Sequence, residues 1–190
     1  MKSCQIYGSG SDIAIGLSIR LKDDGWHVRM LPGRGPPSVV AAQWDLLILM
    51  HGSLEPIGRF FDTYAPAWRE CIHINALHPL AALRVSWPYR NPGATVMFVS
   101  GPNMRTTSPT YTAYRAGKAI LESLVDTLNE EYPDTRFRML RPGPVLTKIH
   151  EQTMKAGNMA ANYERVSRIM SGEEKTVTHE EVYEKLKALL

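Results

Sequence analysis

SCQIYGSGSDIAIG, residues 3–16, determines how the chain is built. Residues 3–7 are typical of a short buried strand, and residues 8–11 form a turn rich in glycine and serine. Ile13, Leu17 and Leu21 then share one helical face, which predicts a helix that ends at Gly25. Residues 26–31 predict a second strand. The segment therefore predicts a strand, a tight turn, a helix and a parallel strand.

This unit commonly binds phosphate groups at its turn. Glycines let the backbone approach a pyrophosphate, and the helix N-terminus attracts its negative charge. A tight turn without a ligand is the alternative. Asp12 is unexpected beside an anion, although its side chain would cap the helix.

Three further strands extend the predicted sheet, at residues 45–52, 95–100 and 136–140. The first is uninterrupted, as expected for a strand covered on both faces. A helix kinked around Pro79 is expected over residues 65–87, a second over residues 112–132, and a short one over residues 38–43. Thr178 and Glu181 form the pattern of a capping box, which predicts a last helix to Leu190.

Composition excludes several classes of protein. The 190 residues suit one domain, and a net charge of +3 from 22 basic and 19 acidic residues does not indicate a nucleic-acid partner. The two cysteines have no metal-ligand spacing, so no metal site is expected. Residues 46–50 form the longest apolar run, far too short for a membrane span, and no signal peptide is apparent. A cytoplasmic protein is expected.

Tyr114 and Lys118 are four residues apart in the helix expected over residues 112–132. The phenol and the ammonium therefore lie on one face, and a nearby cation favours the phenolate that a general base requires. The same spacing recurs at Tyr183 and Lys187, where a solvated helix face is expected. Gly117 is costly inside a helix, which indicates close approach by a ligand or by another backbone.

Taken together, these segments resemble the short-chain dehydrogenase/reductase family over residues 3–150. The segment Arg141-Pro142-Gly143-Pro144-Val145-Leu146-Thr147 matches the family's Pro-Gly-x-Val-x-Thr, at the correct distance after the tyrosine and lysine. The glycine-rich turn departs from the family pattern, because only Gly8 is kept and Asp12 and Ala14 replace the two later glycines. Residues 32–44 are too short for the helix and strand that the family has there.

The resemblance implies an α/β fold, a doubly wound, Rossmann-like parallel sheet of about five strands with helices on both faces. Together with the right-handed crossover rule it gives the order 2-1-3-4-5. It also implies cofactor contacts from the turn, the ends of the second and third strands, the helix of Tyr114 and the segment after the fifth strand. These residues are Gly8, Ser11, Asp12, Ile13, Arg34, Gly52, Tyr114, Lys118, Pro142, Gly143, Val145 and Thr147.

The expected cofactor is NADP, with NAD possible. Residues 29–38 contain no acid to bind a free ribose 2′-hydroxyl, but they contain Arg29 and Arg34, which suit a 2′-phosphate. His51 would lie near the adenosine, where a packing role is expected of it.

Catalytic roles are also implied by the resemblance. Tyr114 would be the general acid and base, and Lys118 would lower its pKa and bind the nicotinamide ribose. Asn75 would bend its helix and hold a water in a proton relay. The substrate serine is ambiguous, because Gly101 lies thirteen residues before Tyr114 and Ser100 fourteen; Ser100 serves if the loop 102–111 has gained a residue, and otherwise the role is lost or passes to Thr107, Ser108 or Thr110.

The predicted function is oxidoreduction between a small alcohol and its carbonyl. The alternative is a nucleotide-binding sensor or subunit of the same fold without turnover. One NAD(P)-binding domain over residues 1–190 is expected, with residues 148–172 as a substrate lid. Aromatic residues on the two long helices predict a homodimer or homotetramer.

Overall fold

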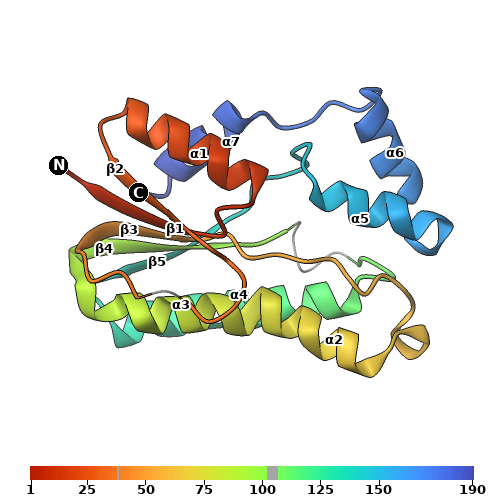
Figure 1. The fold of residues 1–190 in the computed structure, drawn as a ribbon, viewed down its shortest axis with the longest axis horizontal. Helices are drawn as coiled ribbons and strands as arrows, with labels where there is room; N and C mark the ends of the chain where they lie inside the picture. The colour runs from red at the N-terminus through yellow and green to blue at the C-terminus, as the bar shows by residue number, and fades with distance from the viewer. Residues whose placement is uncertain (38, 102–106) are drawn as a thin grey trace.

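The computed structural model describes residues 1–37, 39–101 and 107–190. Its centre is a five-stranded parallel sheet of order β2-β1-β3-β4-β5, which confirms the predicted order (Figure 1). The strands are β1 (Ser3–Tyr7), β2 (His27–Leu31), β3 (Trp44–Leu49), β4 (Arg90–Val99) and β5 (Arg136–Leu140). β2 is added on one side of β1, and β3, β4 and β5 are added on the other, so the strand order reverses between β1 and β3. Ligands bind at this point in open α/β sheets.

Helices cover both faces of the sheet, as predicted. On one face lie α1 (Asp12–Asp23) and α7 (His179–Lys187), and on the other lie α2 (Ala65–Ile72), α3 (His78–Ser86) and α4 (Thr112–Glu131) (Figure 1). Side chains alternate along each strand, so Ile6 and Ile48 belong to the core under α1 and α7. Tyr7 and Leu47 belong to the core above α3 and α4.

The helix expected over residues 65–87 is interrupted earlier than predicted. A π-helical turn at His73–Leu77 separates α2 from α3, and a 3₁₀ turn, Trp87–Tyr89, follows α3. Pro79 explains the position of the break, because proline lacks the N–H that would donate to the carbonyl of Asn75 in a regular helix. The irregularity therefore falls on Asn75, a predicted site residue, and not at Pro79 itself.

The crossover from β2 to β3 contains no helix in residues 32–37 and 39–43, so the short helix predicted over residues 38–43 is wrong there; Ser38 lies outside the described residues. The backbone carbonyl of Ala42 instead accepts a hydrogen bond from the Gln5 side chain, 3.0 Å long. Strand limits also differ: β4 begins five residues before the predicted Thr95, and β3 ends at Leu49.

The C-terminal region consists of short helices. After β5 the chain forms α5 (Ile149–Ala156), a 3₁₀ turn at Gly157–Met159, α6 (Tyr163–Ser171) and α7. A further 3₁₀ turn, η1 (Phe60–Asp62), lies earlier in the chain, before α2. The predicted capping box of Thr178 and Glu181 is present at α7. In the described part of the chain, no helix combines the length and the apolar character needed to cross a lipid bilayer.

The prediction that Tyr183 lies on a solvated face is wrong. Its side chain is buried against α1, and its hydroxyl donates to the Asp24 carboxylate at 2.6 Å. Lys187 is exposed and pairs with Glu184. This second tyrosine and lysine pair therefore stabilises the packing of α7 on α1. It lies away from the carboxyl ends of the strands, which are described next.

Candidate active site

The candidate site lies at the carboxyl ends of the parallel strands. Tyr114 stands in the first turn of α4, and its phenol reaches the end of β4. A Cβ atom built on Gly101 would overlap the phenol oxygen, so the absence of a side chain at Gly101 lets the hydroxyl lie against the backbone. The structure thus places the predicted general acid and base where the topology predicts a ligand.

Lys118 lies one helical turn after Tyr114 and is 3% exposed. Its ammonium donates to the carbonyl of His51 at 2.6 Å and to that of Val99 at 2.8 Å. Because these carbonyls follow β3 and end β4, a buried cation joins two neighbouring strands at their carboxyl ends. Burial lowers the pKa of Lys118 to about 7.

The phenol and the ammonium lie close together, with the Lys118 nitrogen 6.0 Å from the centre of the Tyr114 ring. Burial is the main influence on the phenol, and it raises the pKa of Tyr114 well above its usual value. Tyr114 is therefore protonated at neutral pH in this state. A protonated phenol suits donation to a carbonyl oxygen, the step required of a reductase.

Asn75 is fully buried within the π-helical turn and binds the segment after β3. Its side-chain amide donates to the carbonyls of Ser53 and Cys71, each at 2.8 Å, and its oxygen accepts from the Ser53 N–H at 3.3 Å. These three bonds fix the ends of α2 and β3 relative to each other. Pro79 at the same time deprives the Asn75 backbone carbonyl of its regular helical donor.

Gly117 is explained by the approach of another helix. A Cβ atom at Gly117 would lie 2.6 Å from the Cβ of Asn75, closer than two carbons approach. Of the two explanations left open by the sequence, contact with another chain segment therefore accounts for the glycine. The contact also holds Tyr114 and Lys118 at a fixed distance from Asn75.

Ser100 is buried, and its hydroxyl donates to the Glu122 carboxylate at 2.8 Å. Arg141 pairs with the same carboxylate at 2.9 Å. The single hydroxyl proton of Ser100 is thus already used, and Gly101, which faces the phenol, has no side chain to replace it. Thr110 is also engaged, because its hydroxyl accepts from the Ala161 N–H. Residues 102–106 of the adjoining loop lie outside the described residues.

The glycine-rich turn has the backbone shape expected of it but uses its donors internally. Gly8 has φ +100°, and a Cβ atom there would meet the Met50 carbonyl at 2.8 Å. The N–H groups of Gly8 and Ser9 both donate to the Leu31 carbonyl at 2.9 Å. Gly33 lies directly against the turn, since its Cβ would approach the Cα of Gly8 to 2.7 Å.

Asp12 does not cap the helix, contrary to expectation. Ser11 is the cap, and its hydroxyl accepts from the Ala14 N–H. The Asp12 carboxylate instead accepts from the Lys148 N–H at 2.8 Å and lies 3.5 Å from the Lys148 ammonium. Ile13 follows in the first turn of α1, with its side chain packed against the core under α1 and α7.

The segment after β5 borders the opposite side of the site. Gly143 has φ +92°, Val145 is buried, and the Pro142 carbonyl accepts from the Lys185 ammonium at 2.7 Å. The Thr147 N–H donates to the His150 ring at 3.4 Å. Gly52, at the end of the segment after β3, lies near this side: a Cβ on it would be 3.8 Å from Ile149.

Arg34 and His51, two residues singled out in the sequence, lie in different surroundings: the first is exposed and the second is buried. Arg34 is exposed on the loop after β2. His51 is 6% exposed, stacks on Tyr7 with ring centres 6.4 Å apart, and its Nδ1 has no hydrogen-bond partner among the described residues. Burial and then Lys118 lower the pKa of His51 to about 3, so the ring is neutral at physiological pH. This agrees with the packing role expected for it.

Two residues of the site were not predicted. Glu122 could have been found, because it lies four residues after Lys118 on the same helical face. Lys148 carried no local signal, since its partner Asp12 is 136 residues away in the sequence.

Comparisons with known proteins agree with this geometry. The family model described as enoyl-(acyl carrier protein) reductase matches residues 40–189. An uncharacterised oxidoreductase of Schizosaccharomyces pombe is 30% identical over 118 residues, 62% of this chain and 48% of the relative. The chain thus spans about half the length of the curated relative it matches.

Solved structures show the same fold at low identity. A short-chain dehydrogenase/reductase from Saccharomyces cerevisiae has a TM-score of 0.79 at 19% identity, covering 90% of this chain and 83% of the other. A small-chain dehydrogenase in complex with NADPH has a TM-score of 0.81 at 17% identity, covering 99% and 90%. Aldohexose dehydrogenase from Thermoplasma acidophilum has a TM-score of 0.81 at 16% identity, covering 99% and 86%.

The chain belongs to the short-chain dehydrogenase/reductase family, a family of oxidoreductases. That family implies a nicotinamide cofactor. The residues at the ends of β3 and β4 fit such a cofactor. The buried Lys118 ammonium and the Tyr114 phenol, which lies against Gly101, provide polar groups at these strand ends. At the N-terminus of α1 the fit requires the Asp12 and Lys148 side chains to separate, because a carboxylate stands where phosphate binds in such units.

Proposed function

We propose that the protein is an NADP-dependent oxidoreductase that interconverts a small alcohol and the corresponding carbonyl compound. The observation that supports this most strongly is the buried Lys118, which bridges the ends of β3 and β4 one helical turn from Tyr114. A buried cation is costly, and this one lies beside a group that can exchange a proton with a substrate oxygen.

Each residue has a proposed role. Tyr114 donates its phenolic proton to the carbonyl oxygen during reduction and removes it during oxidation. Lys118 stabilises the phenolate that results and binds the cofactor ribose. The Asn75 backbone carbonyl lacks its regular helical donor, because Pro79 has no N–H. This carbonyl holds the water that returns the proton to Tyr114. When bound, a nicotinamide cofactor would supply the hydride chemistry at the substrate carbon.

Ser100 takes the role of positioning the carbonyl only if its bond to Glu122 opens, because a hydroxyl has one proton to donate. We propose that Ser100 alternates between Glu122 and the substrate. Glu122 is held by Arg141 in either case.

A turnover screen tests the proposal. Purified protein is incubated with NADPH or NADH and a panel of aldehydes and ketones, while cofactor binding is titrated by fluorescence. Carbonyl-dependent oxidation of NADPH supports the enzyme. Tight nucleotide binding without turnover on any substrate supports the alternative, a nucleotide-binding sensor or subunit.

Arg34 supplies the proposed preference for NADP. Its exposed guanidinium lies on the loop after β2, where the 2′-phosphate of NADP would be bound. Arg34→Ala is expected to weaken NADPH binding by about 1–3 kcal/mol, the size of a hydrogen bond to a charged group, and to leave NADH binding nearly unchanged. Titration of both cofactors measures this. Equal losses for the two would assign Arg34 to a shared part of the cofactor or to folding, and a wild-type preference for NADH would contradict the NADP assignment.

The segment 148–172 is proposed to cover the substrate, as a lid on a single domain of residues 1–190. Hydrogen bonds hold it against the site: Gln152 accepts from the Leu54 N–H at 2.7 Å, and the Tyr111 hydroxyl bonds Thr153 at 3.1 Å. Met159 and Met170 remain exposed on this segment. Their flexible thioethers suit contact with apolar substrates of varied shape. Cys4 and Cys71 are both free and buried, which supports a reducing compartment such as the cytoplasm.

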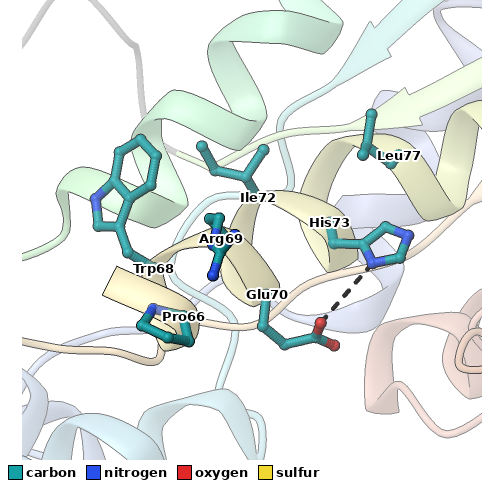
Figure 2. Close-up of a pocket in the computed structure, with 7 residues that line it drawn as sticks. All are labelled: Pro66, Trp68, Arg69, Glu70, Ile72, His73 and Leu77. Atoms are coloured by element: carbon teal, nitrogen blue, oxygen red, sulfur yellow. Dashed lines mark ion pairs between the residues drawn. The ribbon is translucent and has the colours of Figure 1, made fainter. Parts of the chain in front are cut away.

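A homodimer or homotetramer is proposed through α2 and α4, which lie side by side on one face of the sheet (Figure 1). Phe61, in the 3₁₀ turn before α2, is 94% exposed, and Tyr64, the residue that precedes α2, is 74% exposed. Figure 2 shows residues that line a pocket along α2 and the π-helical turn, among them Trp68, Ile72 and Leu77 and the ion pair of Glu70 and His73. Such apolar surface suits self-association.

Sedimentation velocity at micromolar concentration tests this surface. The expected mass is twice that of one 21.3 kDa chain, or four times. Phe61→Glu together with Tyr64→Glu is expected to give the monomer, because charge is unfavourable in an apolar interface. A monomeric wild-type protein would contradict the proposal.

A further inference from the structure

One contact joins the two sides of the proposed cofactor site. Asp12 is the first residue of α1, and Lys148 immediately precedes α5 (Figure 1). The Asp12 carboxylate receives a hydrogen bond from the Lys148 N–H, 2.8 Å long, and its other oxygen lies 3.5 Å from the Lys148 ammonium. We call this pair of contacts the Asp12–Lys148 clip.

The clip occupies the place where a pyrophosphate is expected. In a strand-turn-helix unit the phosphate lies at the helix N-terminus, where backbone N–H groups and the helix dipole attract negative charge. Here the chain supplies its own negative charge at that end, from Asp12. The N–H groups of Gly8 and Ser9 in the same turn already donate to the Leu31 carbonyl. An incoming phosphate therefore meets a carboxylate and a turn with two fewer available donors.

The clip is also easy to open. The Lys148 side chain is 63% exposed and that of Asp12 27% exposed, so water can replace both contacts. Ion pairs with this exposure contribute little to stability. A pyrophosphate carries more negative charge than one carboxylate, and it competes directly for the Lys148 ammonium.

We propose that the Asp12–Lys148 clip closes the dinucleotide site in the free protein and that binding of the cofactor pyrophosphate opens it. Asp12 thereby lowers the affinity for dinucleotides through its charge. Lys148 neutralises Asp12 in the free protein and transfers to the phosphate in the complex. This inference rests on the proposed function, since it assumes that a dinucleotide is the ligand.

Titration of NADPH against four proteins tests the clip: wild type, Asp12→Asn, Lys148→Met, and Glu180→Gln as control. Glu180 of α7 forms an exposed pair with Arg20, which lies on the same helix as Asp12, at 2.7 Å and away from the turn. Asp12→Asn keeps an acceptor for the Lys148 N–H but removes the charge. We expect it to tighten NADPH binding by about three- to tenfold at low salt, and the gain to shrink as salt is raised.

Lys148→Met should change affinity in the opposite direction, because it leaves the carboxylate beside the phosphate without its cation. Glu180→Gln should leave the affinity unchanged. Hydrogen exchange provides a readout that needs no turnover: saturation with NADPH should speed exchange of the Lys148 N–H in wild type while slowing exchange at residues 51–54.

The outcomes separate the two proposals. If wild type and Asp12→Asn bind NADPH equally, or if Asp12→Asn binds it more weakly, the clip is overturned and the cofactor proposal stands. If neither protein binds NADPH, both are overturned. Binding by Asp12→Asn alone, with none by wild type, supports the clip.

Discussion

Tyr114→Phe is expected to reduce turnover by about 10²- to 10⁴-fold and to leave NADPH binding nearly unchanged, because the substitution removes only the transferable proton. The ring keeps its position, since phenylalanine fills the same space beside Gly101 and the Lys118 ammonium. Initial rates with the best substrate of the screen measure the first effect, and fluorescence titration measures the second.

Tyr132→Phe is the matched control, because Tyr132 caps the other end of α4 and packs against Trp87. It should retain wild-type rates. Near-normal turnover by Tyr114→Phe would remove the phenol from the mechanism, and loss of NADPH binding in that variant would make it a binding residue.

Lys118→Met is expected to impair both turnover and NADPH binding, turnover by about 10²-fold or more, because it removes a cation and a ribose donor together. Its effect on folding should be modest: the unfolding free energy at pH 7 should change by about 1 kcal/mol. The variant loses two hydrogen bonds to the His51 and Val99 carbonyls, but it also removes the cost of burying a charge. Rates, titrations and urea unfolding measure these effects separately.

The pH dependence of stability provides an independent check on Lys118. Its pKa is about 7 in the folded protein, against the ordinary lysine value of 10.5 that applies to the unfolded chain. Between these values the unfolded chain binds the proton and the folded chain does not, so the stability of wild type should rise with pH across this window. Lys118→Met should lack this rise relative to wild type, whereas Lys187→Met, which changes an exposed lysine, should keep it. Equal slopes in wild type and Lys118→Met would show that the ammonium stays protonated.

Local patterns were sufficient to predict most of the architecture. The βαβ unit of residues 3–31 and the apolar run of β3 each carry their own signal, and the crossover rule orders the strands. Irregular segments were harder. The π-helical turn at residues 73–77 lies where Pro79 cannot donate to the Asn75 carbonyl, and how a packed helix accommodates that missing bond is not revealed by residue identity alone.

The site was predicted less completely than the sheet, for a physical reason. Spacing on one helix places Tyr114 beside Lys118, but whether Ser100 faces the substrate depends on which acceptor its proton finds, and Glu122 is 22 residues away. Tyr183 has the same spacing to Lys187, and only tertiary packing buries it against Asp24. Contacts between distant segments, such as that of Asp12 with Lys148, lie beyond any local pattern.

The crossover after β2, which forms no helix in residues 32–37 and 39–43, has a consequence for how the protein behaves at high concentration. β2 is the outermost strand next to β1, so one side of its backbone lacks a strand partner among the described residues. An unpaired edge is a template for pairing with another chain. Arg29 places a charged side chain on this edge strand, and charge on an edge strand opposes ordered stacking. Solubility should therefore depend on this residue rather than on the core, and loss of its charge would favour fibrillar over globular association.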